Sequence, residues 1–345
     1  MRKVFALLMV VALVGGVLST AAAARHPEFP NFIPFDPGEG EFAEGVAVDK
    51  VGNVFVSFPN LGEIRKFAPD GEESVLITFD EAGALGLAVD APGNVYVARG
   101  APYRGVYKVD QMGNATLVPG TDAIISSNAL AFDKRGNLYI TETWSVDEPL
   151  FEYPGCGLAG VPSFGPGGIW RVPRDGVAEL WLRDDLLTGL CATGGQIPFP
   201  IGANGIAYRQ GALFVNNTEK AAVLRIPIEK GGNPGMPEVL AVVPDLDPTP
   251  PTGPPFLDGM ALDVHGNIYV PVINQSRIVK IAPDGSSVET LASMFDGLDF
   301  PASLAFGTGK GERQSLFVTN YAIGPPGAGP GLLKIDVGVP GLSLP

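Results

Sequence analysis

The stretch GVAVDKVGNVFVS (45–57) recurs as GLAVDAPGNVYVA (86–98), ALAFDKRGNLYIT (129–141) and GMALDVHGNIYVP (259–271). Each copy places a short apolar run and an Asp before a Gly-Asn turn, and a second apolar run after it. Alternating apolar residues on both sides of such a turn predict a β-hairpin, because this turn needs positive φ. Weaker copies occupy 205–217 and 303–320. The chain therefore repeats one hairpin along its length.

A second hairpin follows each copy of the first. The second hairpins occupy 62–79, 105–119, 167–182, 222–241 and 277–292, and another begins at 331–338. Six units of four strands predict an all-β fold, a six-bladed β-propeller of four-stranded antiparallel blades. The sixth unit lacks its own fourth strand. We expect residues near Asn31 to Phe35 to supply it and so to join the two ends of the chain in one blade.

The N-terminal residues predict a secretory signal peptide over 1–24. Arg2 and Lys3 precede an apolar run over 4–18, and small residues over 21–24 suit cleavage. The remaining residues, 25–345, are predicted to form a single propeller domain. With this signal peptide, we expect a protein outside the cytoplasm, secreted or periplasmic, with no membrane association after cleavage.

The charge balance limits the classes of partner. A formal net charge of −14 argues against nucleic acid and against anionic membrane surfaces, and it suits cation binding. We therefore expect a small molecule as the substrate. The oligomeric state stays open.

Long insertions interrupt the repeat at 142–166, 183–203 and 245–257. They follow a second strand of a blade or precede a first strand, so all three are predicted to project from one face of the disk. Cys156 and Cys191 lie in two of these loops. Either they form a disulfide that joins the loops over that face, or they are two unpaired thiols.

One position per blade, just before the innermost strand, faces the central axis. Reading the blades in order, this position holds Glu44, Leu85, Asn128, Asn204, Asp258 and Ala302. Four of these six side chains carry oxygen. Two carboxylates and two amide carbonyls make a hard, oxygen-only site, which suits Ca²⁺, or another divalent cation, and leaves coordination positions open. Zn²⁺ would prefer His or Cys ligands.

With Glu44, Asn128, Asn204 and Asp258 in blades one, three, four and five, the chain resembles the senescence-marker-protein (regucalcin)/gluconolactonase family. It also resembles the related diisopropylfluorophosphatase and paraoxonase-type calcium hydrolases. The resemblance implies that these four residues are calcium ligands, and that Asp258 also acts as base or nucleophile. Two features depart from these relatives. No His pair stands at the rim, and Ser126 and Ser127 stand where sugar-lactone hydrolases tend to carry an Arg.

The resemblance favours calcium-dependent hydrolysis of a lactone or related ester. Residues after the second strands, or in the loops of the same face, are predicted to orient the substrate: Arg99, Glu142, Trp144, Asn216, Asn274 and Asn320. Two other readings stay open. One is a non-enzymatic binding propeller with a structural calcium, and the other is a strictosidine-synthase-like propeller, which works without the metal. The polar ring argues against the second.

Overall fold

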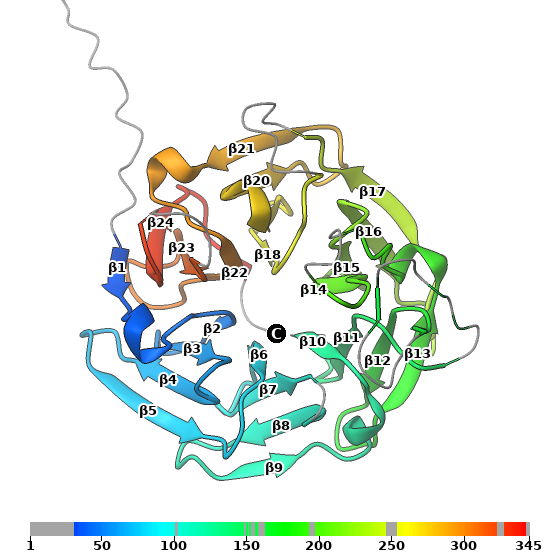
Figure 1. The fold of residues 1–345 in the computed structure, drawn as a ribbon, viewed down its shortest axis with the longest axis horizontal. Helices are drawn as coiled ribbons and strands as arrows, with labels where there is room; N and C mark the ends of the chain where they lie inside the picture. Colours follow the sequence, from blue (N-terminus) through cyan, green and yellow to red (C-terminus); the bar gives the residue numbers. More distant parts are fainter. Residues whose placement is uncertain are drawn as a thin grey trace, which may run out of the picture.

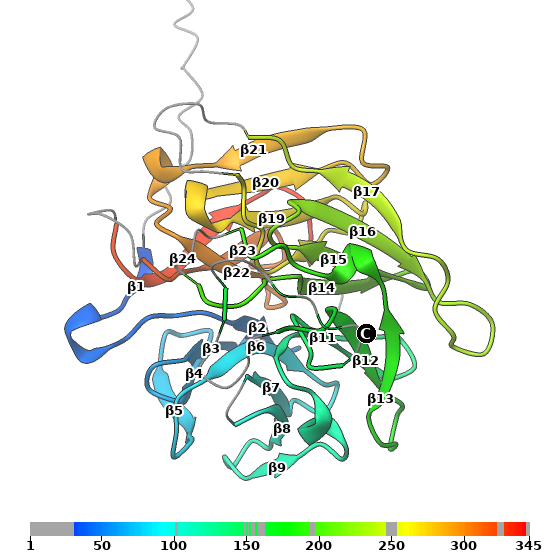
Figure 2. The same cartoon turned by 45° about the vertical axis from the view of Figure 1, so that its right-hand side comes forward.

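The computed structural model describes residues 31–100, 103–147, 150, 152, 156–157, 163–192, 197–245, 254–322 and 328–342. Six four-stranded antiparallel sheets surround a central axis (Figure 1), which confirms the predicted propeller. Figure 2 shows the same blades obliquely. The predicted signal peptide and His26 lie outside the described residues, as do parts of all three insertions.

The first three blades each run outward from the axis in chain order. Blade one holds β2 (Val46–Val48), β3 (Val54–Phe58), β4 (Glu63–Phe67) and β5 (Glu73–Thr78). Blade two holds β6 (Ala84–Val89), β7 (Val95–Arg99), β8 (Gly105–Val109) and β9 (Ala115–Leu117). Blade three holds β10 (Ser127–Phe132), β11 (Leu138–Glu142), β12 (Gly168–Val172) and β13 (Glu179–Arg183).

The last three blades include the one that closes the ring. Blade four holds β14 (Ala203–Arg209), β15 (Ala212–Asn217), β16 (Ala222–Pro227) and β17 (Glu238–Val242). Blade five holds β18 (Ala261–Leu262), β19 (Ile268–Val272), β20 (Arg277–Ile281) and β21 (Val288–Ala292). Blade six holds β22 (Pro301–Phe306), β23 (Ser315–Asn320) and β24 (Gly331–Asp336), and its outer strand is β1 (Asn31–Pro34). The predicted closure by the N-terminal strand is confirmed.

Short 3₁₀ turns lie between strands. They are η1 (Pro37–Glu39), η2 (Thr121–Ala123), η3 (Asp185–Leu187), η4 (Ile273–Gln275) and η5 (Met294–Asp296). Among the described residues, no helix is long and apolar enough to cross a membrane.

The Asp of the repeat stabilises the turn between the first two strands of its own blade. In blade one, Asp49 Oδ1 accepts hydrogen bonds from the backbone nitrogens of Val51 (3.0 Å) and Asn53 (2.9 Å), and Oδ2 accepts from Asn53 Nδ2 (2.6 Å). Gly52 has φ 95°, as the turn requires. Asp90, Asp133 and Asp263 also bind the Asn of their own turns. These carboxylates therefore act structurally, on the face opposite the insertions.

The hydrophobic core lies between neighbouring blades. In one cluster, Phe214 and Val223 of blade four pack with Met260, Val270 and Val279 of blade five. Because each blade has two apolar faces, only a closed ring buries all of them. The innermost strands then line a central channel with two distinct ends.

Candidate metal and active site

The residues predicted to face the axis lie in irregular backbone at one end of the innermost strands. The pairing of β10 with β11 is interrupted between Ser127 and Leu130. The pairing of β14 with β15 is interrupted between Ala203 and Ile206. Asn128 and Asn204 lie within these bulges. Glu44 and Asp258 precede β2 and β18. A bulge redirects a side chain out of the regular pleat, so the local backbone can aim these side chains toward the axis.

Side chains from the second strands join neighbouring blades beneath this ring. Ser57 Oγ accepts from Gly45 N (2.7 Å) and donates to the carbonyl of Leu85 in blade two (2.8 Å). Thr319 Oγ1 accepts from Ser303 N (2.9 Å) and donates to the carbonyl of Glu44 (2.5 Å). Both side chains are fully buried. Sequence reasoning missed them, because their partners in the next blade become neighbours only when the ring closes.

The small residue after each ring position permits the blades to approach. A Cβ on Gly45 would lie 2.5 Å from the carbonyl oxygen of Leu85, and one on Gly205 would lie 2.5 Å from that of Asp258. Such contacts are too short for any side chain. Glycine therefore lets the backbone of Leu85 and of Asp258 rest against the preceding blade.

Glu44 and Asp258 form an electrostatically coupled pair. Burial, and then the charge of Asp258, raise the pKa of Glu44 well above its usual range. Burial raises the pKa of Asp258 to about 7, while hydrogen bonds from Asn204 and the backbone of Gly259 partly oppose the shift. Glu44 Oε2 is buried without a hydrogen-bond partner. Two close, buried carboxylates, one of which has an oxygen without a partner, are unstable as anions unless a cation or a proton compensates their charge.

The two asparagines direct their nitrogens to threonines. Asn128 Nδ2 donates to Thr143 Oγ1 (3.3 Å), and Asn204 Nδ2 donates to Thr218 Oγ1 (3.1 Å). Thr143 Oγ1 in turn donates to the carbonyl of Ala203 (3.0 Å), next to Asn204. The amide oxygens, which are the atoms able to bind a hard cation, remain as acceptors.

The structure thus places the four predicted metal ligands at one end of the channel and connects three of them, Glu44, Asn204 and Asp258, electrostatically. Within the described part of the chain there is no cluster of three or more His, Cys, Asp or Glu able to hold a metal ion. Two of the four predicted ligands are asparagines, so the ring contains only two residues of the types that define such a cluster. Whether these residues bind metal stays a prediction.

The residues predicted to orient substrate all bond within the protein. Arg99 Nη2 donates to the carbonyls of Glu81 (2.8 Å) and Ala82 (3.1 Å). Asn216 is fully buried, and it joins Gly205 N to the backbone of blade five at Asp258. Two further asparagines hold loops of the same face, Asn274 through Phe256 and Pro254, and Asn320 through Asp299 and Gly297. These contacts support an anchoring role, and their contact with substrate stays a prediction.

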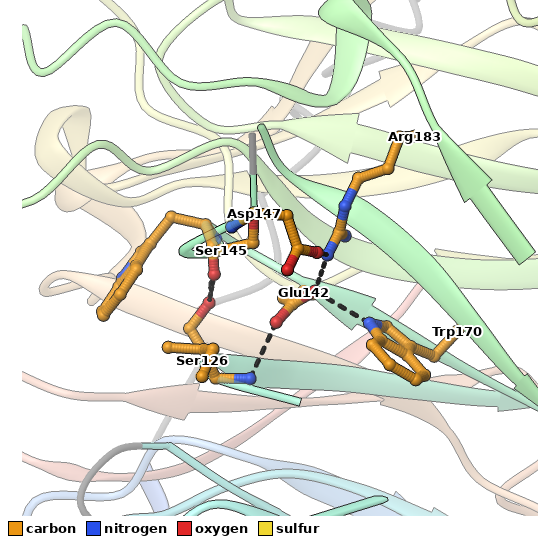
Figure 3. Close-up of polar contacts among 8 residues, drawn as sticks. Ser126, Glu142, Ser145, Asp147, Trp170 and Arg183 are labelled. Carbon is orange, nitrogen blue, oxygen red and sulfur yellow. Dashed lines mark hydrogen bonds and ion pairs between the residues drawn. The ribbon is translucent and has the colours of Figure 1, made fainter. Parts of the chain in front are cut away.

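Glu142, which pairs with Ser127 of β10, is the centre of a polar cluster in blade three (Figure 3). Its carboxylate accepts from Ile125 N (2.7 Å), Trp170 Nε1 (2.7 Å) and Arg183 Nη2 (2.6 Å). Arg183 also binds Asp147 Oδ2 (2.7 Å) in the adjoining loop. Burial raises the pKa of Glu142, and Arg183 opposes that shift. Glu142 thus ties the segment before β10 to β12 and β13, and Arg183 ties the loop after β11 to the same cluster.

Trp144 lies in that loop and packs among other aromatic residues. It is 5% exposed, and its ring centroid lies 5.0 Å from that of Phe164 and 5.9 Å from that of Phe199. Phe164 lies in the 142–166 insertion, and Phe199 lies in the 183–203 insertion before β14. These aromatic residues therefore pack one loop against another. Phe151 and Tyr153 lie outside the described residues.

Of the two alternatives for the cysteines, the structure has the disulfide. Cys156 and Cys191 are bonded, with their Cα atoms 6.2 Å apart. Glu219 holds the second of these loops: its carboxylate accepts from the backbone nitrogens of Leu190 (2.6 Å), Cys191 (2.8 Å), Ala192 (2.5 Å) and Ile201 (2.9 Å). No sequence pattern singled out Glu219. One covalent bond and one buried carboxylate thus fix the insertions that border the ring.

Similarity to known proteins agrees with this geometry. Residues 201–322, from blade four to blade six, match the family model described as the SMP-30/Gluconolactonase/LRE-like region. Asn204 and Asp258 lie inside the matched segment, whereas Glu44 and Asn128 lie outside it. No curated protein sequence matches the chain.

Solved structures share the fold at low identity. A gluconolactonase from Xanthomonas campestris has a TM-score of 0.62 and 20% identity over 88% of this chain and 87% of that one. A calcium-binding regucalcin from Agrobacterium tumefaciens gives 0.63 and 17%, over 88% and 92%. A luciferin-regenerating enzyme gives 0.64 and 16%, over 91% and 98%. These structures show that the chain has the six-bladed propeller fold, and the family model matches its blades four to six.

Proposed function

We propose that the protein is a calcium-dependent hydrolase of lactones or related esters. It would act on a small molecule outside the cytoplasm, secreted or periplasmic, with the metal at the ring end of the channel. The observation that supports this most is the buried, unpartnered Oε2 of Glu44 facing Asp258. A single divalent cation would neutralise both carboxylates and satisfy that oxygen.

The donor atoms of the ring fit calcium. Glu44, Asp258, Asn128 and Asn204 would hold the ion, because all four offer oxygen and two of them offer negative charge. Calcium takes six to eight oxygen ligands, so positions would remain for water and substrate. The bound ion would supply polarisation of a carbonyl oxygen.

Asp258 is the residue of this chain best placed to transfer a proton. Burial brings the pKa of Asp258 to about 7 in the metal-free protein, and a bound calcium ion would lower it and keep the carboxylate ionised, which is the form that acts as a base or nucleophile. Its backbone is fixed by Asn216, which donates to its carbonyl. Asp258 would therefore deprotonate a water molecule or attack the carbonyl carbon itself. No histidine is available for this step in the described chain, because His265 lies in the turn of Asp263 at the opposite end.

The test is hydrolysis of a panel of lactones and aryl esters by the purified protein, with calcium and again after a chelator. We expect turnover that the chelator removes and added calcium restores, and turnover that falls in D258N. Absence of turnover across the panel, from folded and calcium-loaded protein, would contradict the proposal and favour a binding propeller with a structural calcium. Full activity in D258N would restrict Asp258 to a ligand.

A further inference from the structure

The opposite end of the channel forms a cavity of about 380 Å³. This volume lies in the range of small-molecule sites. Every blade contributes large apolar side chains to the wall, among them Val46, Leu87, Leu130, Ile206, Met260 and Leu304. None of the four candidate metal ligands lines this cavity. It is therefore a separate place from the ring, at the end where the Asp-Asn turns lie.

Among the described residues, the charged side chains that line the cavity are both cationic. They are Lys134 in the turn of blade three and Arg209 at the end of β14 in blade four. No Asp or Glu of the described ranges lines it, although the chain has a net charge of −14. A cavity with apolar walls and cations at one end has the polarity of a site for an anion with an apolar tail.

Arg209 is a departure from the repeat. Four blades place Asp at this position, and each Asp binds the Asn of its own turn. Blade four places Arg209 there instead, with its guanidinium against Gly266 in the turn of blade five. Arg209 Nε is buried without a hydrogen-bond partner. Arg209 Nη1 donates to Gln210 Oε1 at 3.3 Å, a long hydrogen bond.

The Asp carboxylates of the turns in blades three and five hydrogen-bond within those turns, and neither forms an ion pair with Arg209 in the described part of the chain. Asp133 accepts hydrogen bonds from Arg135 N and from both nitrogens of Asn137. Asp263 accepts from His265 N, from both nitrogens of Asn267 and from the Tyr269 hydroxyl. Both are therefore engaged within their own blades. A buried guanidinium N–H without an acceptor is costly, and an anionic ligand would remove that cost.

We propose that this end of the channel binds the carboxylate of an amphipathic acid, with Arg209 as its main partner and the apolar tail between the innermost strands. Lys134 contributes a second, solvent-exposed charge. Guanidinium groups suit carboxylates because they offer parallel N–H donors. This site does not depend on the metal ring or on the proposed hydrolysis.

The experiment is isothermal titration of decanoate into the folded protein. We expect saturable binding by the wild type, with acetate and 1-decanol binding far more weakly because each lacks one half of the recognised chemistry. R209Q should weaken decanoate binding about ten- to a hundredfold, since it removes a charge-assisted hydrogen bond. R209K should recover part of the loss, and K134Q should have a smaller effect than R209Q. K230Q, in an exposed turn of blade four, is the matched control and should bind as the wild type does.

A ring variant separates this proposal from the proposed function. D258N should keep decanoate binding whether or not it hydrolyses esters. Three results would overturn the proposal: no decanoate binding by the folded wild type, equal affinity in R209Q and wild type, or loss of binding in D258N with R209Q unaffected. Thermal melting of each variant identifies a change of fold, and R209K provides the second substitution if R209Q unfolds.

Discussion

The two ends of the channel use the same residue types in opposite ways. At the far end, Asp49, Asp90, Asp133 and Asp263 each bind the Asn of their own turn, and their oxygens are satisfied locally. At the ring end, Glu44 leaves a buried oxygen without a partner, and burial raises the pKa of Asp258 to about 7. The difference is one of hydrogen-bond satisfaction. The far-end carboxylates therefore have a structural role, whereas the ring pair is the part of the molecule for which we propose a ligand.

The largest expected effect comes from one substitution made at each end. D258N should lower calcium-dependent hydrolysis at least about a hundredfold, because it removes both a ligand charge and the general base. D263N, the matched change at the far end, should keep hydrolysis but lower the free energy of unfolding by about 1–3 kcal/mol. Initial rates and denaturant melts measure the two effects. Equal loss of activity in both variants would remove the distinction between the ends.

The pH dependence of stability should follow the ring. Without metal, the raised pKa of Asp258 stabilises the fold fully at pH values below 3.8, the ordinary pKa of an Asp. This stabilisation is lost as the pH rises through about 7. Between pH 4 and pH 8 the metal-free wild type should therefore lose more unfolding free energy than the E44Q/D258N variant loses. Calcium should remove the difference in the wild type, because it favours the ionised carboxylates. Denaturant melts at several pH values, with and without chelator, measure this. Parallel curves for both proteins would contradict it.

A bridge beneath the ring should matter less. S57A leaves Gly45 N and the carbonyl of Leu85 without their side-chain partner, so we expect a loss of about 1–3 kcal/mol in unfolding free energy. Because Gly45 adjoins Glu44, calcium affinity should fall modestly as well. Calorimetric titration and melting measure both quantities, with S286A in an exposed turn of blade five as the control. An S57A variant as stable as S286A would show that the bridge contributes nothing.

The smallest effect is expected at a far-end turn. N53A removes the Asn that binds Asp49 Oδ2, while the backbone hydrogen bonds to Oδ1 remain. The loss should be about 1 kcal/mol in unfolding free energy, with calcium affinity unchanged. Chemical denaturation and calcium titration of one preparation test both statements. A change in calcium affinity would mean that the two ends are coupled.

Sequence reasoning predicted the parts of this molecule that follow from repetition. The hairpin period gives the blades, and the strand near Asn31 closes the ring. Residues whose roles depend on contacts between blades could not be found in this way. Ser57, Thr319 and Glu219 were missed, and so was the hydrogen bond by which Asn216 joins two blades. A period describes one blade, whereas these hydrogen bonds exist only between two elements.

Titration of calcium into metal-free protein is the most direct test of the ring as a metal site. We expect the wild type and D263N to bind a single ion, and E44Q and D258N to lose most of that affinity. We also expect proton release on binding near neutral pH, because the raised pKa values of the two carboxylates must be overcome. A wild type that binds no calcium, or an E44Q/D258N variant that binds it as the wild type does, would contradict the assignment of the ring as a metal site.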